Sequence, residues 1–170
     1  MTLAVFALGG NLGEPLSTLR GAAAGLASAL EGTQVSAVYR TEPEGGADQP
    51  PYLNAAVAGT TGLSPRAVLE LARGLEAEAG RRRPYPGAPR TLDVDVVFVG
   101  DAVVDEPGLR VPHPRWADRD FVVVPLLDIV PDFVDPETGR TVRSVAEAAG
   151  WRERALPVAL ERGGLLLSET

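Results

Sequence analysis

The hydrophobic pattern of residues 1–100 alternates between strand and helix. Apolar or alternating runs predict strands near residues 3–8, 34–39, 52–60 and 92–99. Apolar positions spaced three or four apart predict amphipathic helices over 15–30 and 65–80. The resulting order, βαββαβ, is that of the ferredoxin-like α+β fold, in which helices cover an antiparallel sheet.

Turn and cap signals separate these elements. Gly9 and Gly10 end the first strand, residues 42–51 are rich in Gly and Pro, and Ser64 is an N-cap before Pro65. Beyond residue 100 the pattern is less regular. Short strands are expected around Val103 and Leu109, and a proline interrupts the apolar segment 121–129. A short helix is expected over 144–149, followed by an apolar stretch over 156–167.

The chain contains no repeat and no linker, so residues 1–170 are expected to form a single domain. Residues 1–100 would form its βαββαβ core. Residues 101–150 would complete the functional site, and the tail 151–170 has no assigned role.

Composition excludes several classes of protein. The absence of cysteine excludes disulfides and thiolate chemistry and is compatible with the cytoplasm. No apolar run approaches the roughly 20 residues that span a bilayer, so no membrane partner is expected. The net charge of −7 argues against general nucleic-acid binding. All 16 basic residues are arginine, which excludes the phosphate-binding lysine of P-loop and protein kinases.

Asp93 and Asp95 form the most informative pair in the sequence. Side chains two apart on a strand share a face, about 7 Å apart along the backbone, so two carboxylates there need a cation. Mg²⁺ suits them because it takes one or two carboxylates together with phosphate oxygens. The wholly apolar run Val97–Val99 indicates a central strand. The alternative is an edge strand with its acids in solvent.

Arginines precede this pair in a Gly- and Pro-rich loop over residues 81–90. Guanidinium groups bind phosphate in a bidentate fork, and such a loop suits a mobile lid. Alternatively, Arg81, Arg82 and Arg83 complement the negative end of a helix dipole. The two acids and Arg90 together indicate chemistry on a phosphorylated substrate.

Other candidates lie on both sides of the pair. His113, the single histidine, could donate to a phosphate oxygen beside Arg119, although a lone histidine is more often structural. Phe121 is either core or a stacking surface for a flat ring. Tyr52 and Asn54 share a strand face, and Asn54 either recognises a heterocyclic amide or ends the strand in a turn.

Six segments in order resemble one known family, the 6-hydroxymethyl-7,8-dihydropterin pyrophosphokinases of folate biosynthesis. The resemblance covers roughly residues 3–150. The segments are ALGGNL at 7–12, YRTEP at 39–43, DQPPYLNAAV at 48–57, PRTLDVD at 89–95, VPHP at 111–114 and RDF at 119–121.

The resemblance implies an ATP-dependent diphosphotransferase that moves the β,γ-pyrophosphate of ATP to the pterin hydroxymethyl group and releases AMP. It implies two Mg²⁺ held by Asp93 and Asp95, with Asp95 also a candidate acceptor of the hydroxymethyl proton. Its further implied contacts fall into three groups. These are Arg81, Arg83 and Arg90 for the lid and phosphates; Glu76, Arg90, His113 and Arg119 for ATP; and Thr41, Pro43, Tyr52, Asn54, Asp95 and Phe121 for the pterin.

The chain departs from the family pattern at two places. Gly10 stands where serine is frequent, and the loop over 81–90 lacks a tryptophan, with Tyr85 the aromatic that could replace it. Two other readings remain open: a Mg²⁺-dependent nucleotidyl- or glycosyltransferase, and a ferredoxin-like module that binds a small ligand without turnover. Other folate-pathway enzymes are conceivable partners.

Overall fold

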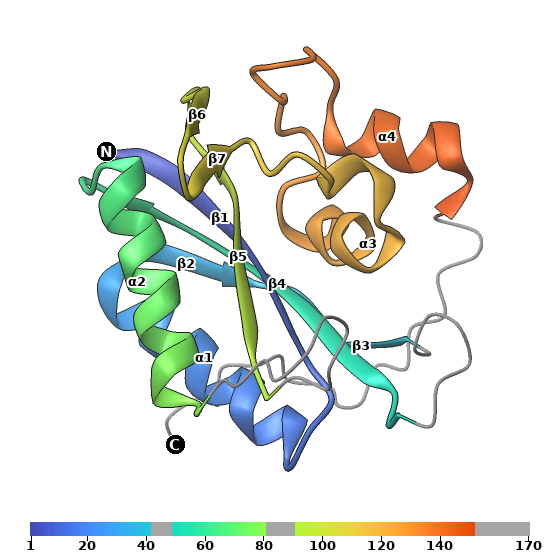
Figure 1. Ribbon diagram of the computed structural model, residues 1–170. Helices are drawn as coiled ribbons and strands as arrows, with labels where there is room; N and C mark the ends of the chain where they lie inside the picture. The colour runs from blue at the N-terminus through green and yellow to red at the C-terminus, as the bar shows by residue number, and fades with distance from the viewer. Residues whose placement is uncertain (42–48, 81–90, 152–170) are drawn as a thin grey trace.

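The computed structural model describes residues 1–41, 49–80 and 91–151. Its main sheet has the order β2 (Glu31–Val35), β4 (Tyr52–Thr61), β1 (Thr2–Gly10) and β5 (Asp93–Val99), as Figure 1 shows. A short strand, β3 (Tyr39–Thr41), also pairs with β4, and every pairing is antiparallel. The ferredoxin-like α+β prediction is confirmed.

Helices cover both faces of this sheet (Figure 1). On one face, strand residues such as Phe6 and Val94 join the apolar cluster of α1 (Pro15–Ala29) and α2 (Pro65–Glu78). On the other, residues such as Val5 and Phe98 join that of α3 (Asp120–Ile129) and α4 (Val142–Ala149). Because successive strand side chains alternate between faces, a sheet covered twice is apolar on both.

The strand expected over residues 34–39 is instead two strands, β2 and β3, which contact different parts of β4. Ser36 marks the break. Its backbone N–H donates to the Ala56 carbonyl at 2.9 Å, while its Oγ accepts from the Ala56 N–H at 2.8 Å. A side-chain oxygen thus takes the place of a backbone acceptor, and the regular ladder is interrupted.

The expectation that Asp93–Val99 forms a central strand is wrong. Among the described strands, β5 pairs only with β1 and lies at the edge of the sheet. Its register with β1 shifts between Val5 and Phe6, so Val97 and Phe98 both face the α3 side. The run is apolar because both faces are covered, not because strands flank it on both sides.

The chain after β5 is more ordered than its pattern indicated. The two short strands expected around Val103 and Leu109 are β6 (Val104–Glu106) and β7 (Leu109–Val111), which form a hairpin. A 3₁₀ turn, η2 (Trp116–Asp118), leads into α3, which contains Pro125. The last expected helix begins two residues early, at Val142.

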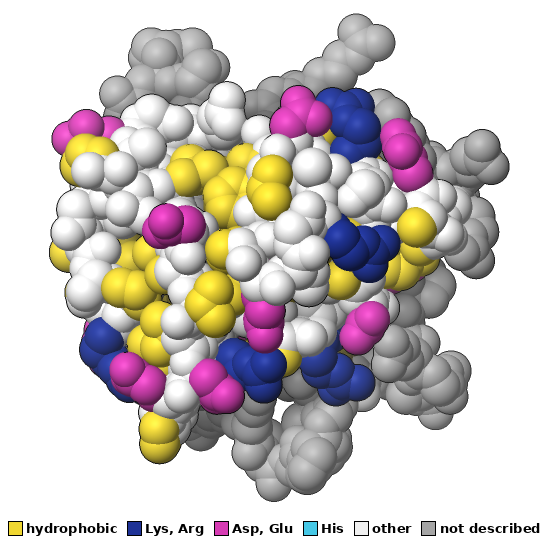
Figure 2. All heavy atoms as spheres, turned by 90° about the horizontal axis from the view of Figure 1, so that it is seen from above, with side chains coloured by type: hydrophobic (Ala, Val, Ile, Leu, Met, Phe, Trp, Pro, Cys, Tyr) yellow, Lys and Arg dark blue, Asp and Glu magenta, His cyan; other side chains and the backbone are white. Residues whose placement is uncertain are grey.

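Residues 152–170, with the apolar stretch expected there, lie outside the described residues, and the single-domain division stays a prediction. In the described ranges no helix has the length and apolarity to cross a membrane. Acidic and arginine side chains are interleaved on the face seen from above in Figure 2. The described residues also form exposed ion pairs such as Arg66–Glu106 and Arg143–Asp132, and pairs of this kind stabilise a fold only slightly.

Candidate active site

Asp93 and Asp95 lie on the sheet face turned away from α1 and α2. Their neighbours Val94 and Val96 are buried in the apolar cluster on the α1 and α2 side, whereas both aspartates are only half-buried. The prediction that the two carboxylates share a face is confirmed. On β1, Gly9 lies opposite Asp93 and Ala7 lies opposite Asp95. Small residues therefore border the aspartates across the sheet.

Asn54 lies on the same face, one strand further from the aspartates. From β4 it lies opposite Gly9 of β1 and opposite Tyr39 of β3, so one row of residues crosses the sheet from Asp93 to Tyr39. The Asn54 side chain is buried, and its Nδ2 donates to Thr41 Oγ1 at 2.8 Å. Asn54 is thus an ordered strand residue and does not end the strand in a turn.

Tyr52 shares this face, as predicted, and its hydroxyl donates to Gln49 Oε1 at 3.3 Å. Gln49 also accepts from Asn11 Nδ2 at 3.2 Å, and the same nitrogen donates to the Pro50 carbonyl at 3.1 Å. Asn11 is buried. The turn after β1 and the segment before β4 are therefore joined beside Tyr52.

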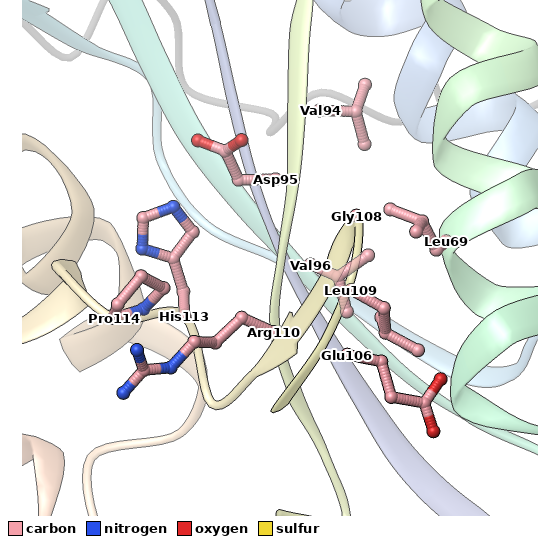
Figure 3. Close-up of a pocket in the computed structure, with 10 residues that line it drawn as sticks. All are labelled: Leu69, Val94, Asp95, Val96, Glu106, Gly108, Leu109, Arg110, His113 and Pro114. Carbon is pink, nitrogen blue, oxygen red and sulfur yellow. The ribbon is translucent and has the colours of Figure 1, made fainter. Parts of the chain in front are cut away.

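His113 faces Asp95 from the segment that follows β7 (Figure 3). Its backbone N–H donates to the Val97 carbonyl at 2.9 Å, and its Nδ1 accepts from the Arg115 N–H at 3.1 Å. Burial lowers the pKa of His113 below its usual 6.5, although the charge of Asp95 opposes this shift. The neutral ring, with Nδ1 as acceptor, carries its proton on Nε2.

A cavity of about 310 Å³ opens beside β5 and reaches both Asp95 and His113. Figure 3 shows that its walls come from the edge strand, α2 and the β6–β7 hairpin. The lining combines apolar side chains with a few polar ones. It consists of Leu69, Val94, Asp95, Val96, Glu106, Gly108, Leu109, Arg110, His113 and Pro114.

Of these residues, the sequence-based candidates include Asp95 and His113, and those that sequence reasoning missed include Leu69, Glu106 and Arg110. Leu69 fits the apolar face of a helix, and the hairpin residues follow an ordinary turn. No local signal marks them, because packing of the hairpin beside α2 brings them together. Arg110 also pairs with Glu137 at 3.6 Å, and Arg66 of α2 holds Glu106 at 2.8 Å.

Glu76 does not line this cavity, although it lies beside it. The side chain is buried, and its Oε1 accepts a hydrogen bond from the Val94 N–H at 2.9 Å. Arg119 and Phe121 stand at the start of α3, with the Arg119 guanidinium carbon 5.6 Å from the Phe121 ring centroid. Phe121 is partly buried against the α3 cluster.

Four expected site residues, Pro43, Arg81, Arg83 and Arg90, lie outside the described residues. Within the described ranges no group of three or more His, Asp or Glu side chains is arranged to hold a metal ion. Asp93 and Asp95 do provide two hard oxygen donors on one face. That donor set fits Mg²⁺, which binds through one or two carboxylates and completes its coordination with water and phosphate.

Comparisons with known proteins show the family of this chain. The family model for 7,8-dihydro-6-hydroxymethylpterin-pyrophosphokinase (HPPK) matches residues 5–131. A Synechocystis 2-amino-4-hydroxy-6-hydroxymethyldihydropteridine pyrophosphokinase is 41% identical over 174 aligned positions, covering 98% of this chain and 86% of the relative. The mitochondrial folate synthesis bifunctional protein of Arabidopsis thaliana is 37% identical over 138 positions, covering 79% of this chain and 24% of its own length.

A solved structure shares the fold. The wild-type HPPK-DHPS of Plasmodium falciparum with SDX-DHP superposes with a TM-score of 0.66 at 14% identity. The match covers 91% of this chain but 44% of the Plasmodium chain, so this chain spans less than half of that protein. From the family match and the identities together, the chain belongs to the 7,8-dihydro-6-hydroxymethylpterin-pyrophosphokinase family.

Proposed function

We propose that this chain transfers the β,γ-pyrophosphate of ATP to the hydroxymethyl group of 6-hydroxymethyl-7,8-dihydropterin in folate biosynthesis, releasing AMP. One observation carries the proposal at the level of the site. Asp95 and His113 face each other at a cavity beside β5, and Asn54 lies on the same sheet face as Asp95. A nucleotide in the cavity and a pterin beside Asn54 would meet at the aspartates.

ATP is the co-substrate, and the cavity beside β5 suits its base. Leu69, Val96 and Leu109 supply apolar walls, while Arg110 and His113 supply donors for ribose or phosphate. His113 is neutral with a proton on Nε2, so it can donate to a phosphate oxygen without adding charge. Arg119 would contribute a cation from the start of α3.

Asp93 and Asp95 would hold Mg²⁺ through their carboxylates. Bound there, the metal would neutralise the phosphate oxygens in the transition state. The resemblance to the family implies two such ions, and the donor set of this face fits hard cations bound jointly with a polyphosphate. Arg81, Arg83 and Arg90 would add charge neutralisation from the loop over 81–90.

The pterin would lie near Asn54 and Thr41, whose side chains hydrogen-bond each other at 2.8 Å. An amide offers a donor and an acceptor together, which matches the edge of a pterin. Tyr52 and Phe121 would provide aromatic surfaces for the ring, and Pro43 would complete the pocket. Small residues at Gly9 and Ala7 leave the pterin room to approach the aspartates.

In the transfer, the hydroxymethyl oxygen forms a bond to the β-phosphorus of ATP. The bond between that phosphorus and the oxygen bridging to the α-phosphate breaks, and AMP leaves with this oxygen. Asp95 is the candidate acceptor of the hydroxyl proton. The chain contributes mainly alignment and charge neutralisation, since phosphoryl-type transfer requires little covalent chemistry from the protein.

Other folate-pathway enzymes are proposed partners. The Arabidopsis bifunctional relative and the Plasmodium HPPK-DHPS chain each carry the matched region within a longer chain. A separate chain could work beside such an enzyme. A cytoplasmic location, favoured by the cysteine-free sequence, stays a prediction.

The nucleotide product tests the proposal. The protein is incubated with ATP, Mg²⁺ and 6-hydroxymethyl-7,8-dihydropterin, and the nucleotides are separated by chromatography. AMP that forms only in the presence of the pterin is the expected result. ADP or inorganic pyrophosphate as product would favour another transferase, and pterin binding without turnover would favour a ligand-binding module.

A further inference from the structure

The short strand β3 and the segment that leads into it are held by hydrogen bonds to α3 as well as by the ladder with β4. Among the described residues, its three residues pair with Tyr52–Asn54 of β4 alone, and Ser36 interrupts the ladder before it. So short an edge strand has few backbone bonds to fix its position. A second set of contacts, made by α3, compensates for this.

Asp128, in the last turn of α3, makes these contacts. Its Oδ2 accepts a hydrogen bond from the Tyr39 hydroxyl at 2.7 Å and another from the Ala37 N–H at 3.1 Å. One carboxylate oxygen therefore holds both the segment leading into β3 and the first residue of β3. Hydrogen bonds to a charged acceptor are among the stronger ones in proteins.

The Tyr39 hydroxyl is a donor under all ordinary conditions. Burial is the main cause that raises the pKa of Tyr39, and the hydrogen bond to Asp128 and its negative charge raise it further. The phenol therefore stays protonated, and able to donate, at neutral pH.

Tyr39 lies in the row of residues that leads to the site. It is directly opposite Asn54, and Thr41, two residues further on the same face, accepts from Asn54 Nδ2. At its other end, α3 carries Phe121, seven residues before Asp128 and about 10 Å away along the helix. The contact from Asp128 to Tyr39 thus joins the helix that bears Phe121 to the strand that bears Thr41.

We propose that Tyr39 and Asp128 are positioning residues for the pterin: their hydrogen bond fixes the placement of β3 relative to α3, and so that of the Asn54–Thr41 pair relative to Phe121. This inference rests on the proposed function, since these residues form the proposed pterin site. Neither side chain needs to touch the pterin. Their effect falls on pterin affinity and not on the nucleotide cavity, which lies beside β5 at the opposite edge of the sheet.

The test compares Tyr39→Phe and Asp128→Ala with the unmodified protein. Tyr39→Phe removes only the hydroxyl, and Asp128→Ala removes both hydrogen bonds. We expect pterin affinity to fall by about threefold to tenfold in Tyr39→Phe. This is less than the full effect of losing one hydrogen bond to a charged group, because the contact acts on the pterin only indirectly. It should fall further in Asp128→Ala, while ATP affinity stays within about twofold of the unmodified value in both variants.

Two further variants sharpen the result. Asp128→Asn keeps an oxygen acceptor and should recover most of the affinity that Asp128→Ala loses. Arg143→Ala breaks an exposed ion pair to Asp132 elsewhere on the α4 side and should leave both affinities unchanged. The double variant Tyr39→Phe/Asp128→Ala should be no worse than Asp128→Ala alone, because the two residues act through one contact.

Amide hydrogen exchange of the substrate-free protein separates this inference from the proposed function. Faster exchange at the β3 amides of Arg40 and Thr41 in both variants, with unchanged exchange in β1, is expected if the contact holds the strand. Unchanged β3 exchange would overturn the inference, as would pterin and ATP affinities that fall equally. If the unmodified protein neither binds pterin nor forms AMP, the proposed function fails instead, and the exchange data still decide whether the contact holds β3.

Discussion

The carboxylate of Glu76 accepts a hydrogen bond from the backbone N–H of Val94 at 2.9 Å, directly between the two aspartates of β5. Glu76 lies on α2 and is 7% exposed. Since β5 pairs only with β1 among the described strands, this N–H has no neighbouring strand to receive it. The Glu76 side chain therefore supplies the hydrogen-bond acceptor that a neighbouring strand would otherwise supply at this edge of the sheet. It does so at the residue between Asp93 and Asp95.

Replacing Glu76 by alanine should affect both stability and turnover. The variant leaves the buried Val94 N–H without this acceptor, which should lower the free energy of unfolding by about 1–3 kcal/mol. The AMP-forming rate should fall as well, because Asp93 and Asp95 flank the loosened residue. Urea unfolding and AMP formation measure the two effects. Glu76→Gln retains an oxygen acceptor and should lose less of each, and equal losses in both variants would contradict a role through this hydrogen bond.

Replacing Asp95 by alanine should abolish turnover without unfolding the protein. The side chain is half-buried and borders a cavity, so its loss leaves little new void behind. We expect the AMP-forming rate to fall by about 100-fold or more, the scale seen when one preorganised electrostatic group is removed. Pterin binding, measured by titration, should be largely retained. Asp101→Ala removes an exposed carboxylate just after β5 and should have normal activity; normal turnover in Asp95→Ala would exclude Asp95 as a metal ligand or proton acceptor.

Much of this site follows from the period of a strand. The two-residue repeat places Asp93 with Asp95, and Tyr52 with Asn54, without any knowledge of the fold. The cap at Ser64 is equally local, and its Oγ accepts from the Ala67 N–H as its position suggests. Features that depend on neighbouring residues alone could be predicted from sequence.

The features that escaped prediction all depend on distant parts of the chain. The apolar run after Asp95 indicates coverage on both faces, but it does not distinguish a flanking strand from the helices and Trp116 that supply this coverage. The break at Ser36 depends on its pairing with Ala56, twenty residues away. Arg110 and Leu69 meet at the cavity only because the β6–β7 hairpin packs beside α2.

Gly9 should be intolerant of a side chain. A Cβ atom placed on Gly9 would lie 3.1 Å from Asn54 Oδ1, closer than most such contacts. Gly9→Ala should therefore displace the Asn54 amide and weaken pterin binding by about tenfold, roughly the loss of one hydrogen bond, while ATP binding changes little. Gly21→Ala on α1 meets nothing within 4 Å and is a matched control, expected to bind both substrates normally and to unfold at a slightly higher temperature. Normal pterin affinity in Gly9→Ala would contradict the prediction, because it would mean that pterin binding does not depend on the position of the Asn54 amide.

Trp116 should anchor the segment that carries His113 and Arg119. Its indole N–H donates to the buried carboxylate of Asp135 at 3.0 Å, and its ring packs edge-on against Phe98 with centroids 5.1 Å apart. Trp116→Phe keeps an aromatic ring but leaves that carboxylate with one hydrogen bond fewer. We expect the free energy of unfolding to fall by about 1–3 kcal/mol, and KM for ATP to rise more than KM for the pterin.

A second substitution, at Asp135, distinguishes the loss of the Trp116 hydrogen bond from the loss of Trp116 packing. In Trp116→Phe/Asp135→Asn the buried group is neutral, so the missing hydrogen bond costs less than beside a carboxylate. The double variant should therefore be more stable than the sum of the two single changes predicts, by about 1 kcal/mol, in urea unfolding analysed with a common m value. Strictly additive losses would mean that Trp116 stabilises the segment through its contact with Phe98 alone. An equal rise of both KM values would mean that its effect is not confined to His113 and Arg119.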